Sequence, residues 1–373
     1  MKKLFVIMCF IGLIYGLSAQ PTPTGFGLRD VNTDVIVGTT LQTGMSDTQS
    51  VLTENSNLQK IFLRDFNLGQ LTCYPAWETW KAKNNNNFSA FNTMINWLIS
   101  KDRLVAARLL VGPDTYFPDW FKTKTFSKNE LDSLMADYIK TAITSNDNNT
   151  KVEYWNVANE TLDSTTHYYN NSNSGIHCRF QELGMETDNS GLTGVDKVNS
   201  EHPVYIRKAF EYARKYTTKK LEFRDFGIEF WNEGKSKAFY QLVKHLLNSG
   251  TPLDAVGFQG HFDLNTENHW NKLTEAILKY KKLGLEVYIT EIDFAYKSTN
   301  WNKQKALKQK QQYTLMMRAI VEANPSWICF WGIRDNWNKY WLYNRHPLLF
   351  EEDLTPKPAY YGVQEGLLSL DPN

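Results

Sequence analysis

The sequence predicts an α/β protein built as a single (β/α)8 barrel with a long loop after its fourth strand. Short apolar strands alternate with amphipathic helices along most of the chain, which is typical of consecutive βαβ units. A barrel of this kind takes roughly 250 residues and more with insertions, so one barrel can account for most of the 373 residues. No glycine-rich phosphate loop follows the first strand, which disfavours an open dinucleotide-binding sheet.

Eight segments have the length and apolar content of barrel strands. In chain order they are Val35–Thr40, Gln70–Cys73, Val105–Val111, Val152–Val157, Leu221–Phe226, Ala255–Gln259, Glu286–Thr290 and Trp327–Trp331. Apolar residues spaced by three and four predict helices between them, over Phe88–Ser100, Lys237–Leu247, Asn268–Leu283 and Lys303–Ala323. Eight strands with helical returns favour a closed barrel.

The connection after the fourth strand is unusually long. It runs to a helix that begins near Pro203 and is rich in Asn, Ser and Gly. Loops longer than about 15 residues are usually functional or disordered. Because this one begins directly after Glu160, we predict a wall or lid over a functional site, with simple surface decoration as the alternative.

Residues 1–19 have the features of a secretory signal peptide, which leaves residues 20–373 as one domain. Lys2 and Lys3 precede an apolar run over Leu4–Leu17, and Ser18-Ala19 supplies small residues for cleavage. A retained anchor is the alternative, but the run is short for a membrane span of about 20 residues. No later segment predicts a span. We therefore expect a soluble protein that is secreted or periplasmic.

Composition excludes some partners and favours another. Lys and Arg number 41 against 40 Asp and Glu, so nothing indicates binding to nucleic acid or to a membrane surface. The 12 Trp, 19 Tyr and 21 Phe residues offer faces on which sugar rings can stack, although each could equally belong to the core. Cys73, Cys178 and Cys329 lack metal-ligand spacing, so we expect buried thiols and leave one disulfide open. We predict no metal, no cofactor and a monomer.

Two carboxylates fall where barrel enzymes place their catalytic groups, at the C-terminal ends of strands. Glu160 closes the fourth strand and follows Asn159, and Glu291 closes the seventh. Cleavage of a glycosidic bond needs one carboxyl group to protonate the leaving oxygen and another to attack or to activate water. Either Glu alone is weak support, because Glu is common in such loops, but the pair indicates a glycoside hydrolase.

Motifs in the C-terminal two-thirds of the chain resemble glycoside hydrolase family 10, the xylanase family. They are, in order, Trp155–Glu160, Gly257–His261, Ile289–Asp293, and Phe330–Gly332 with Asp335. The tail segments Pro347–Phe350 and Pro356–Tyr360 resemble the closing helix of the family. The ordered set is far more specific than any single motif.

The resemblance implies a retaining enzyme in which Glu291 is the nucleophile and Glu160 the acid/base. The two carboxyl groups would then lie about 5–5.5 Å apart. His261 would hydrogen-bond Glu291, and Asn159 would bind the sugar hydroxyl beside the reacting carbon. Residues assigned to substrate binding are Asn159, Gln259, His261, Trp331 and Trp341. For His261 and Trp331, a packing role in the core remains the alternative.

The N-terminal side of the chain departs from the family. Thr72–Glu78 lacks the Glu-Asn pair of the second strand, and Ala107–Pro113 replaces the His-rich third strand. Arg224–Gly227 replaces Asn-Asp-Tyr-Asn on the fifth, and Arg334 stands where Thr is usual on the eighth. The catalytic half therefore matches, whereas the half that binds the glycone is rewritten.

These replacements place Arg108, Arg224 and Arg334 at strand ends, and we expect that they do not adjoin one another. A guanidinium suits carboxylate or sulfate, so one hypothesis is a glycan that carries acidic groups. The competing hypothesis is that these arginines brace loops by pairing with Asp114, Asp225 or Asp335.

The leading prediction is a secreted endo-β-glycanase that acts on β-1,4-xylan or a related, acid-decorated polysaccharide. One alternative keeps the mechanism and changes the backbone to another plant or algal β-glycan. The other is a non-catalytic glycan-binding barrel, which the presence of both Glu residues disfavours.

Overall fold

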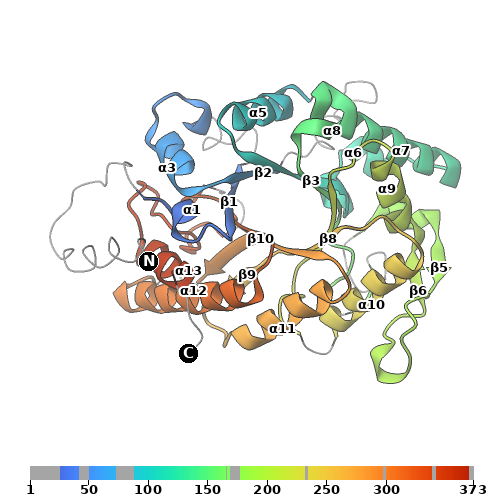
Figure 1. Cartoon of the computed structure of the whole chain (residues 1–373). Helices are drawn as coiled ribbons and strands as arrows, with labels where there is room; N and C mark the ends of the chain where they lie inside the picture. Colours follow the sequence, from blue (N-terminus) through green and yellow to red (C-terminus); the bar gives the residue numbers. More distant parts are fainter. Residues whose placement is uncertain are drawn as a thin grey trace, which may run out of the picture.

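A closed parallel barrel forms the centre of the molecule (Figure 1). The computed structural model describes residues 26–41, 50–72, 88–164, 166–168, 177–231, 234–296, 300–337 and 342–368. Its barrel strands are β1 (Ile36–Leu41), β2 (Leu68–Thr72), β3 (Leu104–Val111), β4 (Tyr154–Asn159), β7 (Lys220–Asp225), β8 (Ala255–Phe258), β10 (Glu286–Ala295) and β11 (Trp327–Phe330). Each strand pairs with the next, and β11 closes the circle by pairing with both β10 and β1. The predicted fold is confirmed, and every predicted strand overlaps an observed one.

Helices surround the barrel and bury their apolar faces against it. They are α1 (Leu28–Val31), α3 (Asn57–Asp65), α5 (Ser89–Ser100), α6 (Asp119–Thr123), α7 (Lys128–Thr144), α8 (Asn148–Lys151), α9 (Val204–Arg214), α10 (Lys235–Asn248), α11 (Trp270–Lys281), α12 (Lys303–Ala323) and α13 (Pro358–Leu367). The four helices predicted with both bounds correspond to α5, α10, α11 and α12, and the helix predicted to begin near Pro203 is α9. Among the described residues, no helix has the length and hydropathy needed to cross a bilayer.

Aromatic side chains close the barrel at the end where its strands begin. Tyr288 and Trp327 stack with ring centroids 4.6 Å apart, and Tyr154 packs against both rings. Tyr154 and Trp327 are the first residues of β4 and β11. These rings fill the lower barrel as large apolar side chains usually do, so any solvent-accessible site must lie at the opposite end.

The upper half of the barrel interior is polar instead. Gln70, Glu222, Arg224 and Glu291 are almost completely buried there. The Gln70 amide donates to Thr40 Oγ1 at 3.0 Å and to the Thr290 carbonyl at 2.9 Å. Burial of charge is costly unless the charges are paired, so this interior must hold its ionic groups in fixed pairs.

The long connection after β4 contains a short antiparallel pair, β5 (Met185–Thr187) and β6 (Glu201–Pro203). This pair lies outside the barrel beside α9 and α10 (Figure 1), where Glu186 contacts Arg207 and His245. The predicted lid is therefore wrong for residues 185–203, because their polar side chains find partners on the outer helices.

An earlier part of the same connection does reach the barrel mouth. The Arg179 N–H donates to Asp114 Oδ1 at 2.7 Å, and the Asp114 N–H donates to the His177 carbonyl. Asp114 begins the loop after β3. The connection thus supports that loop.

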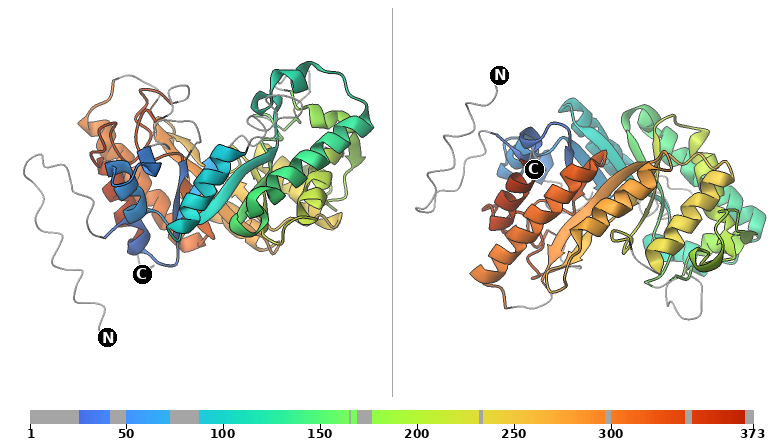
Figure 2. Two further views of the ribbon diagram at one scale, coloured as in Figure 1. Left: turned by 90° about the horizontal axis from the view of Figure 1, so that it is seen from above. Right: turned by 60° about the horizontal axis from the view of Figure 1, so that its bottom comes forward.

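Two glycines allow the last helix to lie close to its neighbour. In Figure 2, α13 runs beside α12. A Cβ at Gly362 would overlap the Lys310 carbonyl, and one at Gly366 would overlap Met317 Cβ. The closing helix that the tail motif predicted is thus present and packs backbone to backbone.

Residues 1–25 lie outside the described part of the chain, and with them the predicted signal peptide. Cys73 and Trp341 also lie outside it. Cys178 and Cys329 are buried as expected, and burial raises the pKa of the Cys178 thiol to about 12.

Candidate active site

Glu291 is the most tightly held carboxylate at the barrel mouth. It lies in β10 beside a register irregularity between Ile289 and Ile292, and its side chain is 1% exposed. Its Oε1 is 2.8 Å from Arg108 Nε and 3.0 Å from Arg224 Nη1. Its Oε2 is 3.2 Å from His261 Nε2, so the expected contact with His261 is present.

These partners keep Glu291 ionised. Burial alone would raise its pKa, but Arg108, the His261 hydrogen bond and Arg224 outweigh burial and lower the pKa to about 2. His261 is itself held by Asp293, whose Oδ2 is 2.7 Å from His261 Nδ1. Burial opposes the charged imidazole, but Asp293 and Glu291 raise the pKa of His261 to about 10. These contacts therefore favour the anionic form of Glu291, which is the form that a nucleophile needs.

Glu160 faces the same space from the end of β4. Gln259 Nε2 donates to its Oε1 at 2.8 Å, and the Tyr116 hydroxyl is 3.0 Å from both carboxylate oxygens. Its backbone is in the left-handed region, with φ at 51°, which is uncommon for any residue but Gly, Asn or Asp. The Glu160 N–H donates to the Arg224 carbonyl at 3.0 Å, and this bond helps to fix the turn.

The chain just past Glu160 is fixed by a second set of contacts. The N–H groups of Thr161 and Leu162 both donate to Asp225 Oδ2. Asp225 in turn pairs with Lys235 Nζ at 2.8 Å. The direction of the Glu160 side chain is therefore set by the end of β7.

Arg108 joins the two carboxylates. It comes from β3, its Nε lies 2.8 Å from Glu291 Oε1, and its Nη2 lies 3.5 Å from Glu160 Oε1. The guanidinium carbon lies 5.0 Å from the ring centroid of Trp331 and 5.4 Å from that of Tyr116, which are cation–π distances. A single guanidinium thus contacts both proposed catalytic groups.

Arg224 supports Glu291 from below. Its Nε and Nη2 bind Glu222 at 2.7 and 2.9 Å, and its Nη1 binds Glu291. Gly257 on the neighbouring strand makes room for this pair, because a Cβ there would overlap Glu222 Oε1. The first residue of the Gly257–His261 motif is therefore a glycine because a larger residue would clash with Glu222.

Asn159 is the last residue of β4, next to Glu160, and Gln259 directly follows β8. Asn159 is fully buried, and within the described part of the chain its Nδ2 has no hydrogen-bond partner. Gln259 Nε2 approaches Asn159 Oδ1 at only 3.5 Å. A buried amide without an acceptor is costly, so this donor is available to a ligand hydroxyl.

Two further predicted binding residues, Trp331 and Arg334, lie in different places: one is in the site and the other is not. Trp331 joins the site, with its ring 5.7 Å from that of His261. Arg334 lies apart from the other two arginines and donates to the Glu352 carbonyl. Whether any of these residues binds substrate stays a prediction.

Two expectations about the arginines were wrong. Arg108 and Arg224 do adjoin, since both contact Glu291 Oε1. Their partners are also not the Asp residues named for bracing: Asp225 pairs with Lys235 and Asp335 with Lys357. The reason is that both side chains point into the barrel rather than toward its rim loops.

Sequence reasoning missed Tyr116 and Glu222. Tyr116 gives no signal, because it lies in an irregular loop. Glu222 does give one, because residues two apart on a strand point to the same face. Acidic and basic residues at 222 and 224 of a buried strand thus indicate an ion pair inside the barrel.

Two acidic–histidine clusters have ligand-like spacing, Asp188 with His202 and His245, and Asp335 with His346 and Glu351. In the first, the Asn189 N–H donates to His245 Nδ1, so a neutral imidazole carries its proton on Nε2, which contacts Glu186. In the second, Lys357 Nζ donates a hydrogen bond of 2.9 Å to Asp335 Oδ2. Asp188, His202 and His245 of the first cluster and Asp335 of the second are thus held by hydrogen bonds within the protein.

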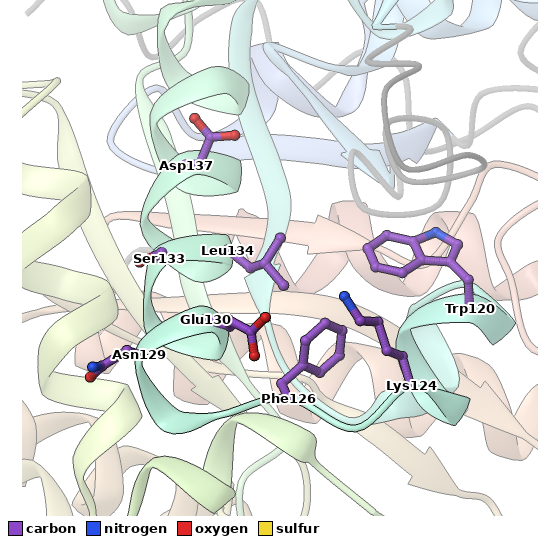
Figure 3. Close-up of a pocket in the computed structure, with 8 residues that line it drawn as sticks. All are labelled: Trp120, Lys124, Phe126, Asn129, Glu130, Ser133, Leu134 and Asp137. Carbon is purple, nitrogen blue, oxygen red and sulfur yellow. The ribbon is translucent and has the colours of Figure 1, made fainter.

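A separate pocket lies between α6 and α7 and encloses about 480 Å³ (Figure 3). Trp120, Lys124 and Phe126 point into it from one side and Leu134 from the other. None of its lining residues contacts Glu160 or Glu291 among the interactions described above. It is thus distinct from the carboxylate site.

An anionic carboxylate facing a second one at the C-terminal end of a (β/α)8 barrel defines the class of barrel glycoside hydrolases. Comparison with known families agrees. The model of glycosyl hydrolase family 10 matches residues 32–366, and the chain belongs to that family.

Related proteins place the chain among divergent members. Endo-1,4-beta-xylanase B of Thermotoga neapolitana is 26% identical over 327 residues, which cover 84% of each chain. Exoglucanase XynX of Acetivibrio thermocellus is 28% identical over 304 residues. The matched region covers 76% of this chain and only 25% of that longer protein. Xylanase 10B from Thermotoga petrophila RKU-1, solved with xylobiose, has a TM-score of 0.76 at 22% identity, covering 92% of this chain and 98% of that one.

Proposed function

We propose that this glycoside hydrolase is a retaining endo-β-glycanase that cleaves β-1,4-xylan by double displacement. Glu291 is the nucleophile and Glu160 the acid/base. The observation that carries the proposal is the placement of Arg108, Arg224 and His261 around the Glu291 carboxylate, at 2.8, 3.0 and 3.2 Å, because these groups favour its ionised form.

In the first step, Glu291 attacks the anomeric carbon while the bond to the leaving oxygen breaks. Glu160 gives its proton to that oxygen, so the negative charge passes from Glu291 to Glu160. In the second step, Glu160 takes a proton from water, the water oxygen bonds to the anomeric carbon and the ester to Glu291 breaks. The buried Asn159 amide would donate to a sugar hydroxyl during both steps.

Xylan is the first choice of backbone because Endo-1,4-beta-xylanase B of Thermotoga neapolitana is related over most of both chains. The name of Exoglucanase XynX keeps a glucan backbone as the second choice. Arg108 and Arg224 are occupied by carboxylates of this chain, so the idea of an acid-decorated glycan now depends on Arg334.

Product analysis tests this proposal. The purified protein is incubated with a panel of xylans, glucans and algal polysaccharides, and early products are followed by proton NMR. We expect β-configured xylo-oligosaccharides of several lengths. An α-configured first product would overturn double displacement, and binding without cleavage of any polysaccharide would support a non-catalytic barrel.

We further propose that the protein is exported, on the basis of the signal-like residues 1–19. The measurement is N-terminal sequencing of the protein recovered from periplasm or medium, and we expect it to begin at Gln20. Recovery of the uncleaved chain in the membrane fraction would favour a retained anchor.

A further inference from the structure

We propose that Arg108 is the counter-ion of both carboxylates in turn, neutralising Glu291 before bond cleavage and Glu160 in the glycosyl-enzyme. This inference rests on the proposed double displacement. It assigns Arg108 an electrostatic role in both steps rather than a contact with an acidic substrate.

The geometry that carries this inference is the bridge that Arg108 forms. Its Nε is 2.8 Å from Glu291 Oε1 and its Nη2 is 3.5 Å from Glu160 Oε1. The side chain is 4% exposed and lies against the rings of Trp331 and Tyr116. It is therefore confined, and it can serve either carboxylate without leaving its position.

The balance of positive and negative charges in the site explains why such a bridge is useful. When Glu160 is protonated and Glu291 is ionised, the site contains three ion pairs, formed by Arg224 with Glu222, His261 with Asp293, and Arg108 with Glu291. Formation of the glycosyl ester removes the charge of Glu291, and proton transfer to the leaving oxygen places it on Glu160. Arg108 would then be left with Glu160 as its partner, so the site stays neutral.

The other cations near Glu291 are not placed for this task. The guanidinium of Arg224 contacts Glu222 and Glu291, and the imidazole of His261 contacts Asp293 and Glu291. The recorded contact between Arg224 and Glu160 is a backbone one, from the Glu160 N–H to the Arg224 carbonyl. The titratable and polar groups near the two carboxylates come from every element around them. They are Arg108 from β3, Tyr116 from the loop after β3, Glu222, Arg224 and Asp225 from β7, Lys235 from α10, Gln259 after β8, His261 from β9 (His261–Asp263) and Asp293 from β10.

The contrast between Arg108 and Arg224 supplies the experiment. Without Arg108, the site would take up a proton at each stage, first on Glu291 and then on Glu160. Aryl β-xylobiosides separate the stages, because kcat/KM reports the first step and kcat with a dinitrophenyl leaving group reports the second. We expect Arg108→Met to move the acid limb of both pH profiles upward by roughly one to two pH units. Arg224→Met should move the limb of kcat/KM only.

Thermal unfolding establishes that each variant is folded, and Arg108→Lys replaces Arg108→Met if the latter is not. A smaller upward shift of both limbs is expected for Arg108→Lys. If either Arg108 variant moves the kcat/KM limb and leaves the kcat limb in place, the counter-ion role in the second step is refuted. Failure of double displacement itself would appear in the unmodified protein, as an α-configured product.

Discussion

In the proposed mechanism, the residues of this site are arranged around one negative charge that moves between Glu160 and Glu291. Glu291 is surrounded by cations, whereas Glu160 is bound mainly by the neutral donors Gln259 and Tyr116. That asymmetry supports the proposed roles, because a nucleophile must be anionic at rest and an acid must carry a proton.

Chemical rescue distinguishes the two roles. Glu160→Ala should spare the first step for an aryl glycoside whose leaving group needs no proton, while the second step slows by roughly 10²–10⁴-fold. Added azide should restore turnover by replacing activated water and yield a β-glycosyl azide. Glu291→Ala should be inactive alone, and any azide product should be α-configured. Rescue of Glu291→Ala with a β-configured product would mean that the roles are reversed.

The backbone of Glu160 gives a second test at this scale. Ala is normally preferred to Gly in folded proteins, but at φ of 51° the Cβ is strained by about 1–2 kcal/mol. Both truncations remove the same carboxylate contacts. Glu160→Gly should therefore be more stable than Glu160→Ala by about 1 kcal/mol, as measured by urea unfolding. The opposite order would show that the left-handed geometry is absent.

Among the elements, β7 and β8 fit together because Gly257 of β8 has no side chain where Glu222 of β7 lies. Glu222 and Arg224 occupy adjacent inward positions of β7, and the space for Glu222 is supplied by Gly257 of β8. The ionic interior thus depends on a glycine that has no chemical role of its own.

Gly257→Ala tests this dependence. The added methyl group would displace Glu222 and leave Arg224 imperfectly paired, and breaking a buried pair costs about 3–5 kcal/mol. We expect a loss of stability of that order together with a fall in kcat/KM. Gly250→Ala is the control, because its Cβ would meet nothing within 4 Å although its φ is 72°. Gly257 lacks the positive φ of Gly250, so a loss at Gly257 no larger than the loss at Gly250 would mean that the clash with Glu222 is not costly.

For the molecule as a whole, the site contributes a pH dependence to folding. The pKa of His261 is raised from 6.5 to about 10, so its contribution is complete below pH 6.5 and is lost as pH rises through about 10. The pKa of Glu291 is lowered from 4.5 to about 2, so its contribution is complete above pH 4.5 and is lost as pH falls through about 2. Both contributions are complete only between those limits, at pH 4.5–6.5.

His261→Gln tests the alkaline side. The free energy of unfolding should fall most at pH 5–6, by the order of a few kcal/mol, and the difference from the unmodified protein should narrow toward pH 10. His269→Gln, at an exposed position, is the control. A difference that stays constant from pH 5 to pH 10 would contradict a charged His261 in the folded protein.

The fold was predictable from sequence further than the site was. Barrel strands and their helices give local signals in the sequence, as apolar runs and as periodic apolar residues. Even the short β2 was predicted from such a signal. That Glu160 and Glu291 lie together could be predicted because strand ends meet at one face, and both contact Arg108; their catalytic roles stay a prediction. The partners of Arg108 and the course of residues 185–203 could not, because they depend on which side chains meet across the barrel and on outer helices far away in sequence.

The left-handed turn at Glu160 also bears on how such a protein could change over time. A descendant that only bound glycans would no longer need a carboxylate there, and a single change to Gly would relieve the backbone at once. In such a descendant, the substitution that removes the carboxylate would therefore also be the one that stabilises the fold. This chain has Glu at a position where its own backbone disfavours it, and the proposed acid/base role would offset this cost. A Gly at this position would thus mark relatives of this barrel that lack the proposed acid/base.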